Sequence, residues 1–463
     1  MNHDEALRYL ASIEGLGIKL ALQNVTQVLS RLGEPQRRFP SVLISGTNGK
    51  GSVAAMLASI LRRAGKRTGL YTSPHLIRHE ERIVVDGRPI AETDFAEAVT
   101  RVHEAVQDLL DAGRLEAHPT HFETLTAAAF DHFARAEVEF AVLEVGMGGR
   151  LDATVLARPR LSIITNVDLE HTAFLGSTVR AIAEEKAGIL PEGGILLTGE
   201  TREDALDPFR ARARLVGGRL IEMREFASVR SAGPGRVSVR TPRRQHVDLA
   251  VGLKGPHQIG NAALAVAACD ILDTLGFSVS DGAIRVGLGE ANWPGRFQIV
   301  EGDPPFIFDG AHNPAACLAL RAALDEFTLG RSGRVTLLFG VLRDKDHEPM
   351  MRALFPAARC VVLTRGTSER FHEPHALRRA AEAAMDGEPR AGSDGSAGLE
   401  ESGLPRMSVS ASISMPAVIV TESLEDGLRE ARSVTPPGGA ICVCGSLYLV
   451  GDTMRALGVN PWP

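Results

Sequence analysis

Short apolar runs alternate with helical patterns along most of the chain, and this alternation constrains the fold more than any other feature. A strand that is buried on both faces is apolar at successive positions, and parallel strands need a crossover between them, usually a helix. The pattern therefore predicts an α/β fold with parallel sheets that helices cover on both faces. The candidate strands are 42–45, 67–71, 140–145, 161–165, 194–198, 306–309, 335–340, 360–364 and 439–444, and the main candidate helices are 52–64, 122–135, 178–188, 259–275 and 314–326.

Three segments break this alternation and indicate how the chain is organised. The segment EANWPGRFQIV (290–300) is typical of a linker, so we expect one domain at 1–295 and a second at 298–463. The segment 219–252 has period-2 character, which predicts a small antiparallel patch. The segment 387–416 is rich in Gly, Ser and Pro, which predicts a mobile surface insertion in the second domain.

Composition excludes several classes of protein. The chain has 463 residues and a net charge of −6, without the basic excess of a general nucleic-acid binder. No apolar run approaches the roughly 18 residues that span a membrane, and the N-terminus lacks the positive region of a signal peptide. Five cysteines are few and odd in number, which favours a reduced, cytoplasmic setting. Cys442 and Cys444 lie two residues apart in a candidate strand and are expected to be buried thiols rather than metal ligands.

A glycine-rich turn follows the first candidate strand in the segment SVLISGTNGKGSVAAML (41–57). It departs twice from the strict phosphate-binding pattern G-x-x-x-x-G-K-[ST], because Ile44 replaces the first glycine and Gly51 follows Lys50. Backbone N–H groups, the start of a helix and one lysine can still hold phosphate at such a turn. The alternative is an ordinary strand–turn–helix connection with a surface lysine.

Longer motifs decide between these alternatives. The turn G-T-N-G-K-G-S resembles the phosphate loop of the Mur ligase superfamily. The rest of the chain is similar to the folylpolyglutamate synthase/dihydrofolate synthase family, in the motifs YTSPHL (71–76), EVGMGGRLDAT (144–154), NVDLEHTAFLG (166–176), EKAGI (185–189), DGAHNP (309–314) and GSLYLVGD (445–452).

The resemblance implies an N-terminal P-loop ATPase domain and a smaller, Rossmann-like C-terminal glutamate-ligase domain. It also implies an ATP- and Mg²⁺-dependent reaction. A carboxylate of dihydropteroate or of a folate glutamate tail takes the γ-phosphoryl group of ATP, and the amino group of L-glutamate then displaces phosphate. Such a reaction depends on positioning and on neutralising the charge of the transferring phosphoryl group.

The resemblance assigns several residues to the nucleotide. The loop residues expected to hold the phosphates are Gly46, Thr47, Asn48, Gly49, Lys50, Gly51 and Ser52. Asn261, Arg296 and Asp309 are expected to contact the rest of the nucleotide or its transferring phosphoryl group. His312 resembles a family histidine near the phosphates and the incoming amino acid. Asn313 and Pro314 also fit the start of a helix, and both interpretations can hold together.

The metal site is likewise implied by resemblance. Ser73, Glu144 and His171 match the Mg²⁺ ligands of the family, and Lys186 matches a lysine that is carbamylated to hold a second Mg²⁺. Each residue alone has an ordinary structural interpretation, and Lys186 alone would be a solvated helix residue after two glutamates. Lys50, His171, Lys186 and His312 are the expected catalytic residues, and a monovalent cation is a further candidate cofactor.

Three stretches match the pterin-binding parts of the family. Their residues are Lys19, Leu20, Ala21, Thr120, His121, Phe122, Glu123, Leu151, Asp152 and Ala153. Ala21 stands where the family often has glycine, and Val155 where it commonly has asparagine. These departures leave open whether the chain makes dihydrofolate, extends folate polyglutamates or does both.

Two other functions compete with this interpretation. A Mur-type ligase acting on a UDP-muramoyl substrate usually carries an extra N-terminal domain, whereas about 40 residues precede the glycine-rich turn here. A nucleotide-dependent switch of the GTPase type would be expected to show N-K-x-D, and the nearest string at 166–168 lacks it. We therefore expect a monomeric ligase whose partners are ATP, L-glutamate and a pteroate or folate, with no nucleic acid and no membrane.

Overall fold

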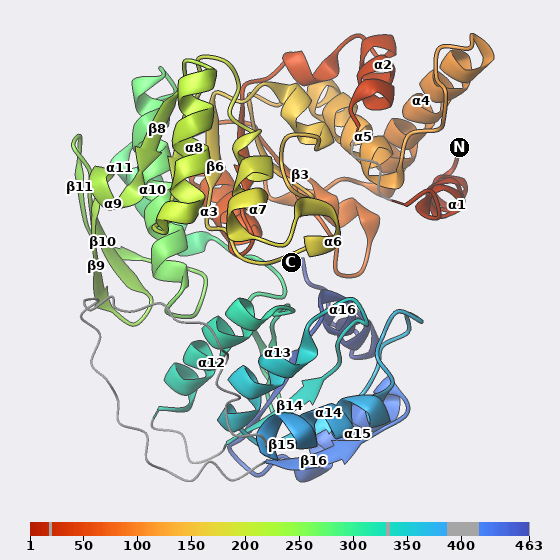
Figure 1. The fold of residues 1–463 in the computed structure, drawn as a ribbon, viewed down its shortest axis with the longest axis vertical. Helices are drawn as coiled ribbons and strands as arrows, with labels where there is room; N and C mark the ends of the chain where they lie inside the picture. The colour runs from red at the N-terminus through yellow and green to blue at the C-terminus, as the bar shows by residue number, and fades with distance from the viewer. Residues whose placement is uncertain (18–20, 330–333, 387–415, 463) are drawn as a thin grey trace. The chain divides into compact units, whose positions relative to one another are not determined.

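The computed structural model describes residues 1–17, 21–329, 334–386 and 416–462, and it divides into two units (Figure 1). The first unit comprises Met1–Arg296 together with the C-terminal tail from Asn460, and the second comprises Phe297–Val459. The division falls inside the segment expected to be a linker. The second domain was expected to run to residue 463, whereas the tail from Asn460 belongs to the first unit. Residues 18–20 and the core of the expected insertion, 387–415, lie outside the described residues.

The first unit is built on an eight-stranded sheet in the order β4-β3-β2-β5-β1-β6-β7-β8. Strands β2, β5, β1, β6, β7 and β8 run parallel, as predicted, whereas β3 and β4 form an antiparallel edge. The strands are β1 Ser41–Ser45, β2 Thr68–Tyr71, β3 Ile83–Val85, β4 Arg88–Pro89, β5 Phe140–Glu144, β6 Leu161–Ile164, β7 Ile195–Thr198 and β8 Arg219–Glu222.

Both faces of this sheet are buried. In β1, Leu43 faces one apolar core while Val42 and Ile44 face the other, because successive side chains of a strand point to opposite faces. The first core is shared with α1, α2, α4, α5, α7 and α8, and the second with α3, α10 and α11. The longer helices of the unit are α1 His3–Glu14, α2 Gln23–Arg31, α3 Lys50–Arg63, α4 Glu92–Asp111, α5 His121–Arg135, α7 Val179–Ala187, α8 Glu203–Leu215, α10 Gln258–Thr274 and α11 Asp281–Glu290.

The short helices of the first unit lie in its connecting segments. They are η1 Pro35–Arg37, η2 His79–Arg82, η3 Ala153–Ala157, α6 Thr172–Leu175 and α9 Met223–Phe226. Strand β1 lies at the centre of the sheet between β5 and β6, and its helix α3 leads to β2 on the far side of β5. Ligands of open α/β sheets bind at the carboxyl ends of the strands beside such a change of direction.

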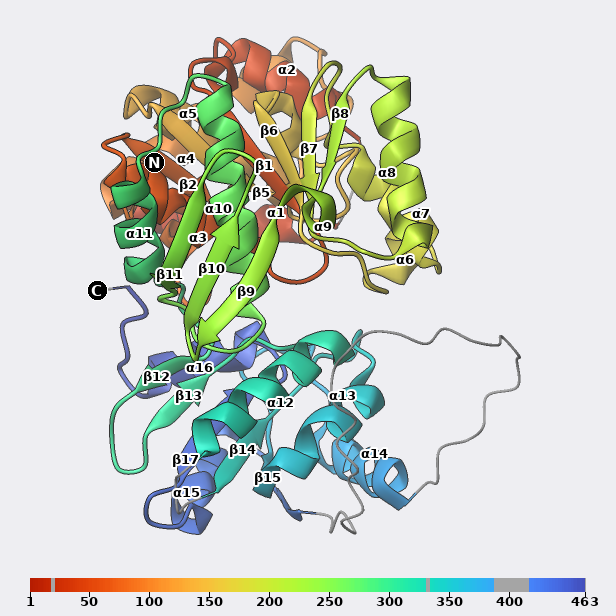
Figure 2. The same cartoon turned by 90° about the vertical axis from the view of Figure 1, so that its left-hand side faces the viewer.

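The expected antiparallel patch is a three-stranded sheet, β9 Ser228–Gly233, β10 Arg236–Arg240 and β11 Gln245–Ala250, that lies beside α10 and α11 (Figure 2). The prediction set its start too early. Residues 219–222 form β8 and pair in parallel with β7 in the large sheet. Four residues are too few for the sequence pattern to distinguish a strand of the large sheet from a strand of the antiparallel patch. Their pairing with β7 places them in the large sheet.

The second unit is a six-stranded sheet in the order β12-β13-β17-β14-β15-β16. All neighbours are parallel except β12, which pairs antiparallel with β13 at one edge. An α/β second domain is thus confirmed, with one antiparallel strand where the linker was expected to end. The strands are β12 Gln298–Val300, β13 Phe306–Phe308, β14 Val335–Phe339, β15 Ala358–Leu363, β16 Ala417–Val420 and β17 Ala440–Cys444.

The helices of this unit include α12 Pro314–Thr328, α13 His347–Leu354, η4 Phe355–Ala357, α14 Pro374–Asp386, α15 Leu424–Val434 and α16 Leu447–Ala456. Cys442 and Cys444 lie on β17 and contribute to one buried cluster, so the predicted buried thiols are confirmed. Within the part of the chain that the structure describes, none of the helices combines the length and the apolar composition that a membrane crossing needs.

Candidate active site

The glycine-rich loop connects the end of β1 to the start of α3 at the centre of the large sheet. Gly46 and Gly49 have φ angles of +142° and +85°, which residues with side chains rarely adopt. A Cβ on Gly46 would lie 1.9 Å from Thr165 Oγ1, and a Cβ on Gly49 would lie 2.6 Å from Asn261 Oδ1. The two glycines therefore let the loop pass close to its neighbours and leave its backbone at the positive end of α3.

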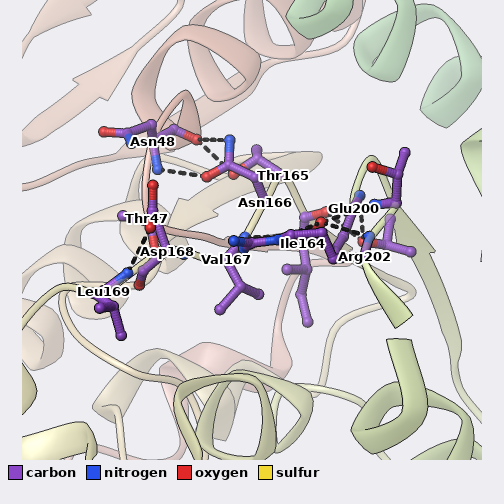
Figure 3. Close-up of polar contacts among 12 residues, drawn as sticks. Thr47, Asn48, Ile164, Thr165, Asn166, Val167, Asp168, Leu169, Glu200 and Arg202 are labelled. Carbon is purple, nitrogen blue, oxygen red and sulfur yellow. Dashed lines mark hydrogen bonds and ion pairs between the residues drawn. The ribbon is translucent and has the colours of Figure 1, made fainter. Parts of the chain in front are cut away.

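The segment after β6 holds this loop in place (Figure 3). Thr47 N donates to Asn166 O at 2.9 Å, and Asn48 N donates to Asn166 Oδ1 at 3.0 Å. Asn166 Nδ2 and Thr165 Oγ1 both donate to Asn48 O, at 3.1 and 2.6 Å. Asp168 N donates to Thr47 Oγ1 at 2.9 Å. These hydrogen bonds join the two strand ends into one cradle.

Glu200 follows β7 and holds the segment after β6 in place. Its buried carboxylate accepts hydrogen bonds from Val167 N at 2.8 Å, Thr201 N at 2.8 Å and Arg202 N at 3.0 Å (Figure 3). Sequence reasoning assigned no role to Glu200, to Thr165 or to Asn166. The signal that could have found them is their place directly after apolar strands, where the carboxyl ends of the sheet meet.

Lys50 is the first residue of α3, and its side chain folds back over the loop. Its Nζ donates to Gly46 O at 2.9 Å and to Thr47 O at 3.0 Å. The ammonium group therefore lies on the loop rather than on the solvent-exposed side of the helix. Its charge opposes the burial that raises the pKa of the Glu144 carboxyl, and it adds to the burial that lowers the pKa of the Lys186 amine.

Glu144 and Ser73 meet at the carboxyl ends of β5 and β2. Ser73 N donates to Glu144 Oε2 at 3.3 Å. Burial raises the pKa of the Glu144 carboxyl, and the charge of Asp152 acts in the same direction. The charges of Lys50 and Arg296 and the hydrogen bond from Ser73 oppose this shift. The structure therefore brings together a hydroxyl-bearing residue and a carboxylate that the sequence separates by 71 positions. Both oxygens are suitable ligands for a hard cation such as Mg²⁺.

In the same unit, His171 lies directly before α6 and Lys186 lies on α7. His171 precedes α6 with φ +50°, and its Nε2 lies 3.9 Å from Glu170 Oε1. Lys186 has only 3% of its surface exposed, so the solvated-lysine interpretation is wrong. Burial lowers the pKa of its amine to about 7, Lys50 acts in the same direction, and Glu170 opposes the shift.

Asn261 and Ser52 are joined through a glutamine that the sequence analysis did not single out. Gln258 Nε2 donates to Ser52 Oγ at 3.3 Å, and Asn261 Nδ2 donates to Gln258 Oε1 at 2.9 Å. A Cβ on Gly51 would lie 2.7 Å from Trp293 Nε1, so that indole packs against the start of α3. Helix α10 and the segment after α11 therefore also support the loop and the start of α3.

The remaining nucleotide-site candidates lie in the second unit. Asp309, after β13, accepts hydrogen bonds from Phe297 N and Ala311 N, both at 2.9 Å. His312 Nδ1 lies 2.8 Å from Gly310 O. Asn313 Oδ1 accepts from the N–H of residue 316 at 2.8 Å, so the predicted helix start is confirmed. Asp309 thus orders the strand-to-helix turn that carries His312.

Two of the three predicted pterin stretches have clear structural roles. Thr120 and Glu123 form a reciprocal capping box at the start of α5, with bonds of 2.7 and 3.2 Å. Asp152 accepts from the N–H groups of residues 146, 147 and 154, at 2.9, 3.2 and 3.0 Å, and orders the loop after β5. Phe122 packs so close to Gly146 that a Cβ there would lie 2.6 Å from its ring.

The other residues predicted for the substrate complete this description. His121 is the first residue of α5, directly after its capping threonine. Leu151 is half-buried and Ala153 is buried at the start of η3, while Ala21 is exposed. Lys19 and Leu20 lie outside the described residues.

Comparison with known proteins agrees with this architecture. The Mur ligase middle domain matches residues 44–269, and the Mur ligase, glutamate ligase domain matches residues 295–447. The dihydrofolate synthase/folylpolyglutamate synthase of Bacillus subtilis is 34% identical over 353 residues, which are 74% of this chain and 81% of the relative. A bifunctional folylpolyglutamate synthase/dihydrofolate synthase from Yersinia pestis, solved with AMPPNP and a Mn ion, has a TM-score of 0.81 at 28% identity and covers 99% of this chain and 98% of its own.

An archaeal relative is longer. The probable bifunctional folylpolyglutamate synthase/dihydropteroate synthase of Haloferax volcanii is 35% identical over 462 residues, which are 98% of this chain but 50% of that protein. The chain thus spans about half the length of this relative. The matches to the two Mur ligase domains define a Mur-type ligase. Within that class, the chain belongs to the folylpolyglutamate synthase/dihydrofolate synthase family.

Proposed function

We propose that the chain is an ATP- and Mg²⁺-dependent ligase that joins L-glutamate to dihydropteroate, to the glutamate tail of a folate, or to both. One observation carries this proposal. Lys50 lies in the glycine-rich loop, and its charge reaches both the buried Glu144 beside Ser73 and the buried Lys186. The relative solved with AMPPNP, an analogue of ATP, and a Mn ion supports a nucleotide and a divalent metal at this kind of site.

The proposed reaction has two bond-forming steps. A carboxylate oxygen of the folate substrate attacks the γ-phosphorus of ATP, which forms an acyl phosphate and releases ADP. The amino group of glutamate then attacks the acyl carbon, so that a C–N bond forms, phosphate leaves and the amine loses a proton. The loop N–H groups, Lys50 and Arg296 hold the phosphates and offset the charge that develops on them.

The proposed metal site is inferred from the chemistry of the side chains that would bind the ion. Ser73, Glu144 and His171 would hold one Mg²⁺, which when bound neutralises phosphate charge. The side chains of Ser73 and Glu144 supply oxygen ligands, which suit Mg²⁺ better than the histidine does. The hydrogen bond between Ser73 N and the Glu144 carboxylate holds the two oxygen donors together.

Lys186 would hold the second metal in a carbamylated form. A lysine amine with a pKa of about 7 is about half unprotonated at neutral pH. The free amine attacks CO₂, an N–C bond forms, and one proton is released. The product is a carboxylate, which turns a buried cation into an oxygen ligand.

The remaining roles are carried over from the family resemblance. Asn261 and Asp309 would contact the nucleoside, and His312 the phosphates or the incoming glutamate. The stretches around Thr120–Glu123 and 151–153 would bind the pterin. We also expect a cytoplasmic monomer, and size-exclusion chromatography with light scattering tests the oligomeric state.

Release of phosphate from ATP tests the function. We expect release only when L-glutamate is present together with dihydropteroate or tetrahydrofolate, each assayed separately and its product identified by mass. Lys50→Ala is the matched inactive variant, and exposed Lys254→Met is its control. Release stimulated by a UDP-muramoyl substrate instead would replace the proposal with another Mur-type ligase. Release that no acceptor stimulates would contradict ligase activity.

A further inference from the structure

Three side chains of types that can bind a metal, from separate elements of the first unit, converge at one place. Glu14 is the last residue of α1, His79 is the first of η2, and His121 is the first of α5. One ligand atom of each lies within 4.8 Å of the other two. None of the three belongs to the proposed Mg²⁺ ligands, while His121 also lies in the Thr120–Glu123 stretch proposed to bind the pterin.

One ring nitrogen of each histidine is buried. Among the described residues, neither His79 Nε2 nor His121 Nε2 has a hydrogen-bond partner, and both atoms are buried. The ring centroids lie 5.6 Å apart. An unpaired buried polar atom costs about 1–3 kcal/mol. Two such atoms beside one carboxylate therefore indicate that a ligand satisfies them.

The protonation state of both rings suits a metal. Burial lowers the pKa of His79 to about 4 and that of His121 to about 3. Arg82 lowers both pKa values further, and Glu80 opposes the shift at His79. Both imidazoles are therefore neutral at pH 7, which is the form that binds a metal.

The backbone that carries these histidines is already ordered. The carboxylate of Glu81 accepts hydrogen bonds from three successive N–H groups of residues 76–78, at 2.8, 3.0 and 2.8 Å. The capping box of Thr120 and Glu123 holds the first turn of α5. Little ordering would be needed when an ion binds, and such preorganisation favours binding.

We propose that Glu14, His79 and His121 form a site for a divalent transition-metal ion of the Zn²⁺ type. Two imidazoles and one carboxylate are a ligand set for Zn²⁺, with water completing the tetrahedron. Mg²⁺ is disfavoured because it prefers oxygen ligands. Zn²⁺ bonds of about 2.0–2.1 Å hold ligand atoms about 3.3 Å apart. Glu14 is exposed, so its side chain is free to rotate toward the histidine nitrogens when an ion binds.

Titration of the metal-free full chain with Zn²⁺, in excess Mg²⁺, tests the proposal. Calorimetry should find one Zn²⁺ equivalent in the wild type that is absent in His79→Phe. Co²⁺ should give the visible absorption of a tetrahedral site in the wild type only. Phenylalanine suits this position because the His79 ring already packs near Phe95, at 6.3 Å between centroids. Glu14→Gln should bind Zn²⁺ at least about tenfold more weakly.

His132→Phe is the matched control. His132 lies on α5, as His121 does, and burial lowers its pKa, but it is outside the cluster. Its Zn²⁺ affinity should equal that of the wild type. Equal Zn²⁺ binding by the wild type and His79→Phe would overturn the proposal, as would no binding by the wild type. If His79→Phe does not fold by circular dichroism, the exposed Glu14→Gln variant decides, and unchanged affinity there overturns the proposal.

Discussion

The side chain of Lys186 shows how burial changes the chemistry of a single residue. Its neighbours in sequence, Glu184 and Glu185, indicate a solvated helix face, yet only 3% of the lysine surface is exposed. Transfer of an ammonium group out of water disfavours its charged form, so the pKa of the amine falls to about 7. The sequence pattern predicts that the residue lies on a helix. The packing of α7 buries its amine, and this burial decides whether the amine is a cation or a neutral nucleophile.

Lys186→Met should abolish glutamate ligation and increase stability at pH 7. Between pH 7 and 10 the unfolded chain binds the proton while the folded chain does not, so wild-type stability rises with pH in this window. Methionine removes that dependence. The variant should therefore exceed the wild type by about 1–3 kcal/mol in the free energy of unfolding near pH 7 and by less at pH 9.5.

Urea unfolding at the two pH values, in chelator and without CO₂, measures the difference. Lys254→Met is the control, because Lys254 is exposed and should change neither activity nor the pH dependence. Near-normal ligation by Lys186→Met would contradict the carbamate proposal. A stability difference independent of pH would contradict the assigned pKa.

At the scale of elements, the site is a set of strand ends. The glycine-rich loop after β1 is bonded to the segment after β6, and that segment is bonded to Glu200 after β7. Glu144 at the end of β5 and Ser73 after β2 lie on the other side of β1 in the sheet. The order of the parallel strands therefore assembles residues that are far apart in the chain.

Gly46→Ala should abolish ATP-dependent turnover. The new Cβ would lie 1.9 Å from Thr165 Oγ1, so the loop or the β6 segment has to move. Gly65→Ala is the matched control, because Gly65 also has a positive φ of +78° but no atom within 4 Å of its added Cβ. It should cost about 1 kcal/mol of stability and leave turnover unchanged. Steady-state kinetics and thermal unfolding of both variants test the contrast, and equal activities would contradict it.

Glu200→Gln should weaken nucleotide binding without removing a ligand-contacting group. The amide NH₂ replaces one of two oxygens that accept backbone N–H groups, which leaves a buried donor poorly paired. We expect a loss of about 1–2 kcal/mol in stability and about a tenfold higher KM for ATP, with a smaller change in kcat. Glu222→Gln is the control, since that strand-end carboxylate pairs with Arg210 and Arg224 instead. A KM for ATP that stays unchanged in Glu200→Gln would show that the carboxylate does not position the loop.

At the scale of the whole molecule, the end of the chain returns to the unit in which the chain began. Trp462 packs against Trp293, with ring centroids 5.7 Å apart, and Trp293 packs against Gly51 at the start of α3. The tail therefore supports the glycine-rich loop through one intermediate side chain. Local sequence pattern cannot predict this contact, because the residues next to Trp462 do not indicate which part of the protein its side chain packs against.

Trp462→Ala should lower the stability of the first unit by about 1–2 kcal/mol, because a half-buried aromatic contact is lost. Trp462→Phe should retain most of that stability. The chain contains two tryptophans, so fluorescence of the variants reports Trp293 alone. Its emission should shift to longer wavelength in Trp462→Ala as water reaches the indole. Emission and unfolding midpoints equal to those of Trp462→Phe would contradict the supporting role of the tail.

The sequence by itself determined the α/β class, the predicted strands and the glycine-rich turn. These follow from apolar spacing, turn chemistry and motifs of several residues, all of which are local. Tertiary structure alone decided that β8 joins the large sheet and that Glu200 and Gln258 support the loop. It also decided that Lys186 is buried and that Glu14, His79 and His121 meet. Burial and long-range contacts depend on which surfaces pack together, and a local sequence pattern does not specify the packing of distant segments.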